Sequence, residues 1–436
     1  MNCDPERDIG GLNVWCFNNN AGSFMQRTNT FILAPTIEQE RILRDKATNC
    51  AKLWNEATYR KRQAYINYQP LDWKCKDLYQ KYSPLIDSAT AQQIIRKNNE
   101  SWRSFFALKQ LEREDRLPPN IEKVRMPRYW KRDGKYRLMM VLRNDCYSVK
   151  DGVMKLPKKL KIPIRGKPKW IGKQGKTEVI YDEVDGKWRV FQAVKTKPLF
   201  KPKGSKTCYI DPGIINLFTI WLEGWRQPIA YSGRNLLSDW WYWVDRIADC
   251  QSILETINSK KGSKHLSRLY RIRQRRFRQA INTMIRNMVR DLYELGVSKI
   301  VIGDLTGIRE DNDKGRKSNS MIHNFWSFNH LVQRLKCTAQ EYGIGVREAS
   351  EYKTSSRCIR CGSENIESKG RLFKCLDCEL EANRDAIGTL NMANLYGGHA
   401  VRVMTHPKLL KWDGVRWQAN RPMTHRLMNM IEARIS

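Results

Sequence analysis

Two cysteine pairs constrain the fold of this 436-residue chain more tightly than any other feature of its sequence. Cys358 and Cys361 are separated by two residues, as are Cys375 and Cys378, and 13 residues lie between the two pairs. Each pair can present two thiolates from a tight turn, and four thiolates close a tetrahedral shell around Zn²⁺. Because such a shell has no open position for a substrate, we predict a structural zinc ribbon. The alternative is four unrelated free thiols.

The second constraint is electrical charge. The chain carries 79 Lys and Arg against 45 Asp and Glu, which gives a formal net charge of +34 at pH 7. Such a surplus strains a compact state by self-repulsion, and duplex nucleic acid neutralises it with about one negative charge per 1.7 Å of axis. A basic surface that is merely solvated mixes both signs and has a much smaller net charge. The charge balance therefore predicts a nucleic-acid partner.

Nothing in the sequence indicates a membrane protein. It contains no run of about 18 apolar residues, the length that a membrane-spanning helix requires. The opening residues MNCDPERDIGG are acidic and no apolar segment follows them, which is unlike a secretory signal. We expect an intracellular, cytoplasmic protein associated with a prokaryotic nucleoid. In a reducing compartment, clustered cysteine pairs indicate metal binding more often than disulfides.

The first part of the chain predicts a strand followed by helices. Residues 28–33 are strand-like, and Thr36 with Gln39 has the sequence signature of a capping box. Apolar residues then recur at helical spacing to about residue 117, where Pro118-Pro119 stops the pattern. Aromatic and basic residues are interleaved along this region, which suits a surface that binds nucleic acid. An ordinary helical bundle with aromatic core positions is the alternative, and the two are compatible.

From residue 126 the apolar period changes to two, which predicts short strands and a small β-barrel. The strands are expected at 137–142, 148–150, 153–156, 179–181 and 188–194. The segment 155–176 is expected to be a basic loop that grips phosphates. Its candidate nucleic-acid-binding residues are Lys158, Lys159, Lys161 and Arg165.

A linker at 198–204 precedes a domain with a different pattern. Its expected order is three strands, two helices, a strand, a helix, a strand and a helix, which is the order of a ribonuclease-H-like domain. The strands are expected at 207–211, 217–222, 228–231, 299–302 and 344–349, and the helix between the last two at 329–342.

The second helix of this domain, residues 265–295, has an unusual charge pattern. Between Lys264 and Arg290 it carries nine Lys or Arg and no acid, whereas a solvated helix normally mixes both signs. We predict that this basic helix follows a phosphate backbone. Its candidate nucleic-acid-binding residues are Arg268, Arg271, Arg273, Arg275 and Arg276.

Two aspartates lie where a nuclease would need them. Asp211 ends the apolar strand at 207–211 and precedes Pro-Gly, and Asp385 opens an expected helix at 386–395. Hydrolysis of phosphodiesters by two metals requires carboxylates that converge on ions about 4 Å apart. Taken alone, each aspartate would be a turn or N-cap residue. The domain order and the adjacent zinc ribbon favour a catalytic role.

These residues resemble the TnpB family in an ordered set of motifs that covers roughly residues 28–396. The matching segments are Thr30 to Asn55 with its Trp54-Asn55 pair, Pro127-Arg128-Tyr129, Ile210-Asp-Pro-Gly-Ile, the basic helix, Lys299 to Leu305, Thr354-Ser355, and Asn383-Arg-Asp385 through Asn391. The resemblance implies an RNA-guided DNA endonuclease that hydrolyses DNA phosphodiesters by two-metal chemistry. Its cofactors would be two Mg²⁺ ions, which Mn²⁺ could replace, one structural Zn²⁺ and a guide RNA. Its partners would be the guide RNA and target double-stranded DNA, with no membrane and no set oligomeric state.

The resemblance also implies an α+β multidomain fold. A wedge β-barrel of the OB-like kind would be interrupted by a helical recognition lobe and followed by a ribonuclease-H-like (RuvC) α/β domain with an inserted zinc ribbon. The expected boundaries are 1–24 for an N-terminal extension, 25–48 and 119–200 for the barrel, 49–118 for the helical lobe, 201–353 and 383–396 for the nuclease domain, 354–382 for the ribbon that binds target nucleic acid, and 397–436 for a basic C-terminal tail.

The third carboxylate departs from the family pattern. Relatives usually have a glutamate where this chain has Gly303, and the adjacent Asp304 should point to the opposite face of its strand. Some relatives, including Fanzor proteins, have a glutamate just before the Thr-Ser of the zinc region, where this chain has Glu351. The implied catalytic and magnesium-binding set is Asp211, Glu351 and Asp385, with Asp304 in reserve and Glu348 as a further alternative.

Two other functions stay open. A compact type V CRISPR nuclease would have the same chemistry with a CRISPR guide, and only the neighbouring genes would separate the two. A nuclease-dead, RNA-guided DNA-binding repressor is favoured by Gly303 and by Asn383, which stands where many relatives have an acid. The retained Asp211 and Asp385 and the position of Glu351 oppose it.

Overall fold

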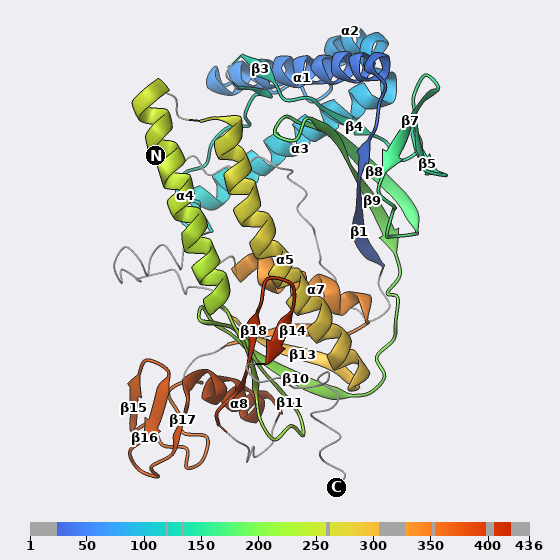
Figure 1. The fold of residues 1–436 in the computed structure, drawn as a ribbon. Coiled ribbons are helices and arrows are strands. Elements are labelled where there is room, and N and C mark those ends of the chain that lie inside the picture. The colour runs from blue at the N-terminus through green and yellow to red at the C-terminus, as the bar shows by residue number, and fades with distance from the viewer. Residues whose placement is uncertain are drawn as a thin grey trace. The chain divides into compact units, whose positions relative to one another are not determined.

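A computed structural model describes residues 24–118, 121–132, 134–258, 262–304, 328–350, 354–397 and 405–419 (Figure 1). The chain divides into two compact units, one formed by Gln26–Thr196 and the other by Lys197–Ser436 together with Met1–Met25. Each unit has its own apolar core. Among the described helices, none combines the length and apolarity that crossing a membrane would need.

Three helices form the helical part of the Gln26–Thr196 unit: α1 (Ile37–Ile66), α2 (Lys76–Ile86) and α3 (Ser88–Arg113). The predicted capping box at the start of α1 is confirmed, because Thr36 Oγ1 accepts from the Gln39 N–H (3.3 Å) and Gln39 Oε1 accepts from the Thr36 N–H (3.1 Å). The helices pack on one another through a buried apolar face that includes Leu43, Leu78 and Ile94.

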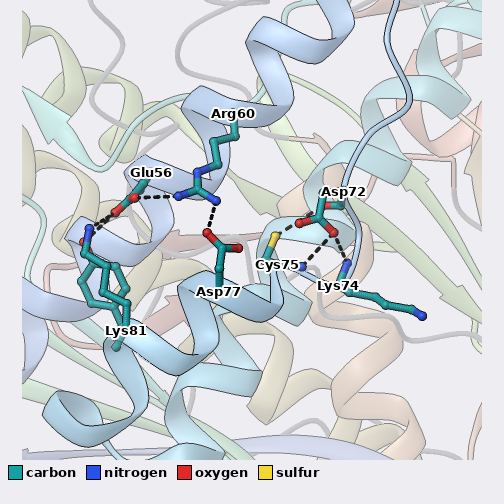
Figure 2. A network of polar contacts seen from close by, with 8 residues as sticks. Glu56, Arg60, Asp72, Lys74, Cys75, Asp77 and Lys81 are labelled. Atoms are coloured by element: carbon teal, nitrogen blue, oxygen red, sulfur yellow. Dashed lines mark hydrogen bonds and ion pairs between the residues drawn. The ribbon is translucent and has the colours of Figure 1, made fainter.

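Ion pairs connect α1 and α2 at the surface of their contact (Figure 2). Glu56 and Arg60 on α1 face Lys81 and Asp77 on α2, and the Lys81 Nζ lies 2.8 Å from a Glu56 carboxylate oxygen. These side chains are largely exposed to solvent, where ion pairs contribute little to stability. The apolar face therefore supplies most of the stability of this helical layer.

Two motifs that are far apart in the sequence meet on α1. Trp54 Nε1 donates to the Arg128 carbonyl (2.9 Å), and Asn55 Oδ1 accepts from the Trp130 N–H (2.6 Å). The rings of Trp54 and Trp130 stack with their centroids 4.3 Å apart. The Trp54-Asn55 pair therefore fixes the path of the segment that contains Pro127-Arg128-Tyr129, which gives these motifs a shared structural reason.

The strands of this unit form one seven-stranded sheet in the order β4-β8-β9-β1-β7-β6-β5. No pairing joins β4 to β5 in the part of the chain that the structure describes, so the expected barrel is seen here as a sheet. The strands are β1 (Met25–Leu33), β4 (Met139–Leu142), β5 (Ser148–Lys150), β6 (Val153–Leu156), β7 (Leu160–Arg165), β8 (Lys173–Asp182) and β9 (Lys187–Thr196), and β2 (Lys131–Arg132) pairs with β3 (Lys135–Tyr136) separately.

The expected basic loop at 155–176 is wrong over part of its length. β7 occupies 160–165 and pairs with both β6 and β1. In β7 the apolar Leu160, Ile162 and Ile164 alternate with exposed Lys161, Pro163 and Arg165. The many basic residues masked this period of two, which places Ile162 in the core.

The second unit is built on a seven-stranded sheet in the order β14-β13-β10-β11-β12-β18-β19 (Figure 1). β10 pairs antiparallel with β11 and parallel with β13, and β13 pairs parallel with β14. The predicted order of strands and helices is confirmed. The elements are β10 (Lys206–Pro212), β11 (Asn216–Leu222), β12 (Ile229–Ser232), α4 (Arg234–Asn258), α5 (Lys264–Glu294), β13 (Val297–Asp304), α7 (Phe328–Glu341), β14 (Gly345–Ser350) and α8 (Arg384–Gly397).

A C-terminal hairpin extends this sheet. β18 (Lys408–Trp412) pairs parallel with β12, and β19 (Trp417–Ala419) pairs with β18. Trp417 Nε1 donates to the Ala280 carbonyl of α5 (3.0 Å), and its ring packs edge-on against Tyr231. The sequence did not predict any strand in this part of the expected tail. Trp412 is buried in the core of this unit, and Trp417 packs against that core.

The cysteine region forms a small three-stranded sheet of β15 (Ile366–Lys369), β16 (Leu372–Cys375) and β17 (Glu381–Asn383). Its core contains Phe373, Leu380 and Ala382, and Ile387 of α8 packs against it. β17 runs directly into α8, which packs on β10 and β11. The ribbon thus sets where α8 begins.

Candidate metal centres

The four cysteine sulfurs converge on one point. All four Sγ atoms lie within 4.8 Å of one another, and the Cys358–Cys378 and Cys361–Cys375 Sγ–Sγ distances are both 3.5 Å. Ligands at the usual Zn–S length of about 2.3 Å would stand about 3.8 Å apart in a tetrahedron. The cluster therefore has the spacing and the donor set that suit Zn²⁺.

Two similar turns present the sulfurs. Gly362 follows the first pair with φ +79°, and Glu379 follows the second with φ +56°, so both turns use a left-handed residue at the same place. The Arg360 N–H points at Cys358 Sγ (3.4 Å). Burial opposes ionisation of Cys375, but the N–H groups of Cys378 and Asp377 and the neighbouring thiols lower its pKa to about 7. The pKa values of Cys358, Cys361 and Cys378 are raised, with burial opposing their ionisation, so without metal the thiolate form is favoured at Cys375.

Asp211 lies against the backbone of α8. A Cβ placed on Gly388 would stand 2.6 Å from Asp211 Oδ2 and 3.4 Å from its Cγ, so a larger residue there would force this carboxylate to shift. Gly388 follows Asp385 by three positions, which puts both on one face of the helix. The fold therefore brings the carboxylates of β10 and of the α8 N-terminus to the same edge of the sheet.

Three polar groups surround Asp385, whose side chain is 15% exposed. Asn216 Nδ2 of β11 donates to Asp385 Oδ2 (2.6 Å), and Arg371, from the β15–β16 turn, forms an ion pair with the same oxygen. Asn383 Oδ1 accepts from the N–H groups of Asp385 (3.1 Å) and Ala386 (3.3 Å). Asn383 is therefore the N-cap of α8, a role that an uncharged side chain performs as well as an acid does.

The strand register separates Gly303 from Asp304. β13 continues through Asp304, where Gly303 pairs with Ala349 and Asp304 with Ser350, and Gly303 is buried while Asp304 is exposed. The two residues thus point to opposite faces. The side chain of Glu348 forms an ion pair with Lys336.

Glu351 lies outside the described residues, but the chain on either side of it is held to α8. The Ser350 carbonyl accepts from the Tyr396 hydroxyl (3.0 Å). Asn391 Nδ2 donates to the carbonyls of Thr354 and Arg357, both at 2.7 Å.

The sequence and the fold of this chain are similar to those of known proteins. Residues 191–309 match a family described as a probable transposase, and residues 328–392 match one described as the Cas12f1-like TNB domain. TnpB-like protein ORF457 of Acidianus two-tailed virus is 32% identical over 366 residues, which are 76% of this chain and 79% of that protein. The chain belongs to the TnpB-like family.

More distant similarities agree with this membership. TnpB-like protein L79 of Acanthamoeba polyphaga mimivirus is 26% identical over 223 residues, which are 49% of this chain and 41% of that protein. A chain in the cryo-EM structure of the Cas12f1-sgRNA-target DNA complex superimposes with a TM-score of 0.53 at 15% identity, covering 82% of this chain and 83% of that one. At that identity the match shows a shared fold alone.

The predicted nucleic-acid-binding arginines of the basic helix differ in exposure and in their contacts within this TnpB-like chain. Arg268, Arg275 and Arg276 are exposed on α5, whereas Arg271 and Arg273 are half-buried. Arg276 forms a two-pronged ion pair with Asp239 of α4 (2.8–3.0 Å), and the Arg273 guanidinium lies 3.9 Å from the Trp240 ring centroid. Those two arginines therefore help to hold α5 against α4.

The four basic residues of the other unit are all exposed: Lys158, Lys159, Lys161 and Arg165. Lys158 and Lys159 form the β6–β7 turn with φ of +62° and +60°, and Lys158 Nζ lies 3.5 Å from the Pro84 carbonyl. Left-handed lysines in a turn are strained relative to glycine by about 1 kcal/mol or more.

Sequence reasoning missed three residues of the carboxylate site: Asn216, Arg371 and Gly388. Only Gly388 carried a signal, because a glycine within a helix costs up to about 1 kcal/mol relative to Ala and usually has a packing reason. Asn216 and Arg371 act through contacts with Asp385, which lies 169 residues from Asn216 and 14 residues from Arg371. No local pattern could have indicated them.

Proposed function

We propose that this TnpB-like chain is an RNA-guided DNA endonuclease with a metal-dependent, RuvC-like active site. The observation that carries the proposal is the convergence of Asp211 and the Asp385 face of α8 at Gly388. The strand order β12-β11-β10-β13-β14, with two antiparallel and two parallel pairings, supports a ribonuclease-H-like core.

Asp211, Asp385 and Glu351 would hold two Mg²⁺ ions. These ions would activate a water and stabilise the leaving oxygen of the cleaved phosphodiester. Asn216 orients Asp385 by donating to its Oδ2, and the Asn383 cap fixes the first turn of α8. Gly303, on the strand beside that of Asp211, supplies no side chain, so the third carboxylate would come from another residue, and Glu351 follows directly after the neighbouring β14.

The net charge of the chain and its similarity to a solved nucleic-acid complex both support nucleic-acid partners. A net charge of +34 needs a polyanion, and the solved relative with the shared fold is titled as a complex with sgRNA and target DNA. In such systems base pairing to the guide selects the target, while the protein binds shape and backbone. Guide RNA and target double-stranded DNA are therefore the proposed partners, with a transposon or CRISPR source of the guide equally compatible.

The zinc site would be structural. Four cysteines leave no open ligand position, and the ribbon positions both Arg371 and the start of α8. Its loss would disturb Asp385 without removing any nuclease ligand.

One observation favours a second candidate, a binding protein that does not cut. The ion pair between Arg371 and Asp385 neutralises a proposed magnesium ligand. In a nuclease, this arginine would have to release the carboxylate when metal binds.

A four-variant experiment tests the proposal. Asp211→Ala, Glu351→Ala and Asp385→Ala should each abolish magnesium-dependent cleavage and leave guided DNA binding nearly intact, because the ligands act as a unit. Asp304→Ala should keep substantial activity. Cleavage and binding are measured under identical salt with the copurified RNA present. An inactive Asp304→Ala beside an active Glu351→Ala would overturn the carboxylate assignment, and a parent protein that binds but never cuts would establish the second candidate.

A further inference from the structure

A cavity in the Gln26–Thr196 unit has no role in the proposed cleavage chemistry. Its volume is about 470 Å³, which is within the range of cavities that hold small ligands. It lies between the C-terminal half of α1, the C-terminal half of α3 and the segment 123–128. Five of its nine lining residues are basic, and none is acidic: Arg62, Lys109, Lys123, Arg125 and Arg128.

Part of this basic lining is held rigidly. Arg62 donates from Nε (3.1 Å) and Nη2 (2.7 Å) to the Pro127 carbonyl, and its guanidinium lies 4.6 Å from the Tyr129 ring centroid. Lys109 pairs with Glu112, whose other oxygen accepts from the Val124 N–H (3.3 Å). These contacts fix the shape of the cavity wall.

The remaining cations face solvent. Lys123, Arg125 and Arg128 are exposed, and the carbonyl of Arg128 is held by Trp54. No ion pair of Lys123 or Arg125 occurs within the described part of the chain. Lys123 interacts electrostatically with Glu112 without forming an ion pair, so the rim keeps positive charge that is available to a ligand.

The floor of the cavity is apolar and aromatic. Tyr65 and Phe105 meet edge-to-face with their ring centroids 5.3 Å apart, and the ring centroids of Trp102 and Phe106 lie 6.2 and 5.8 Å from that of Tyr65. Phe105 is buried, and Met126 completes the lining beside it. A flat aromatic ligand would find a preformed surface here.

We infer that this cavity binds one unpaired nucleotide, with its base against the aromatic floor and its phosphates at the basic rim. The inference rests on the nucleic-acid partnership of the proposed function. An isolated phosphate would leave the apolar floor unused, and an apolar ligand would leave the three exposed cations Lys123, Arg125 and Arg128 without a counter-charge. A base in a duplex cannot present its face, whereas an unpaired base can, at about 1–3 kcal/mol per stacked base.

Two variants of the full chain separate charge from cavity. Lys123→Ala/Arg125→Ala removes two rim cations, and Arg41→Ala/Lys52→Ala, exposed on α1 outside the cavity, is the matched control. Met126→Trp fills the cavity and keeps every charge, with Met126→Phe as a smaller replacement in case the tryptophan unfolds the unit. Thermal unfolding of each variant reports its folding.

The probes are 12-nucleotide thymine oligomers of deoxyribose and of ribose type, and a deoxyribose oligomer of equal length made of abasic sites. Binding is titrated by fluorescence anisotropy from 50 to 200 mM salt. The wild-type chain should bind the thymine oligomer at least about fivefold more tightly than the abasic one. Met126→Trp should remove most of this preference with an unchanged salt slope. Lys123→Ala/Arg125→Ala should lower the slope by about 1.4, twice the single-strand value per phosphate.

The outcomes decide the inference without reference to cleavage. An unchanged preference in both Met126 variants would overturn it, as would equal binding of thymine and abasic oligomers by the wild-type chain. A salt slope that falls as much in the Arg41/Lys52 control would show that the rim is not special. Preference for the ribose or the deoxyribose oligomer assigns the nucleotide to guide RNA or to DNA. A nuclease that never cuts would leave these binding results untouched.

Discussion

The two candidate metal centres are assembled in opposite ways. The cysteine cluster takes all its ligands from one short segment, and its two turns share one local geometry. The carboxylate site joins β10, β11, α8 and a turn of the ribbon, so its parts meet only after the sheet has formed. The first should therefore fail through loss of its own ligands, and the second through any change that shifts one element against another.

The largest effect should come from breaking the local site. Cys375→Ser should lose one equivalent of zinc per chain and unfold the ribbon, because structural zinc binding contributes about 10–16 kcal/mol in isolated zinc-finger peptides. Metal content by mass spectrometry and hydrogen exchange over 354–382 measure the two effects. Cys146→Ser, outside the ribbon, is the matched control. Full zinc content and unchanged exchange in Cys375→Ser would show that the cluster is no metal site.

The second prediction breaks the non-local site without touching a ligand. In Gly388→Ala the new Cβ would stand 2.6 Å from Asp211 Oδ2, so the carboxylate must move. A displacement of about 1 Å can cost about a hundredfold in rate, and we expect at least that loss of cleavage. The substitution should also stabilise α8 by up to about 1 kcal/mol.

Cleavage rate and thermal unfolding, measured on one preparation, check the Gly388→Ala prediction. Leu395→Ala, exposed on the same helix, controls for a general effect on α8. A variant that is more stable and fully active would mean that Asp211 does not act where the structure puts it.

The difference between the sites also explains what could be predicted from the sequence. The four cysteines could be assigned from spacing alone, and the register of β13 with β14 agrees with the expected directions of Gly303 and Asp304. Asn216 and Arg371 could not be found, because both act on Asp385. That residue lies 169 residues from Asn216, and it is separated from Arg371 by the strands β16 and β17. The β18–β19 hairpin was missed because its pairing partner, β12, lies far earlier in the chain.

The arginines of α5 also show the limit of local sequence information, because their number can be read from the sequence but their partners cannot. Counting cations marked all of α5 as a phosphate surface, but Arg276 is already paired with Asp239. Arg268→Ala/Arg278→Ala should lower the salt slope of duplex binding by about 1.8, the value for two lost phosphate contacts. Arg276→Ala should lower it by less and should reduce stability. Equal slopes for the two variants would argue that the Asp239 ion pair opens when nucleic acid binds.

The smallest effect should come from relieving backbone strain in the second turn of the cysteine cluster. Glu379 holds φ +56° at the place where the first turn has Gly362, so Glu379→Gly should relieve backbone strain. We expect the ribbon to gain up to about 1 kcal/mol, seen as slower hydrogen exchange and tighter zinc retention against a chelator. Glu379→Gln keeps the strain and removes the charge, so it separates the two contributions.

Gly362→Ala should change the stability of the ribbon in the opposite direction to Glu379→Gly. An added Cβ at Gly362 would meet no atom closer than 4.0 Å, so any loss of stability there must come from its φ of +79° rather than from a clash. The two turns should thus respond in mirror fashion, Gly362→Ala losing zinc faster and Glu379→Gly more slowly. If Glu379→Gln reproduces the gain of Glu379→Gly, the benefit is electrostatic and the two turns are not equivalent. If neither Gly362→Ala nor Glu379→Gly changes the rate of zinc loss, sulfur–metal bonds alone determine the stability of the cluster.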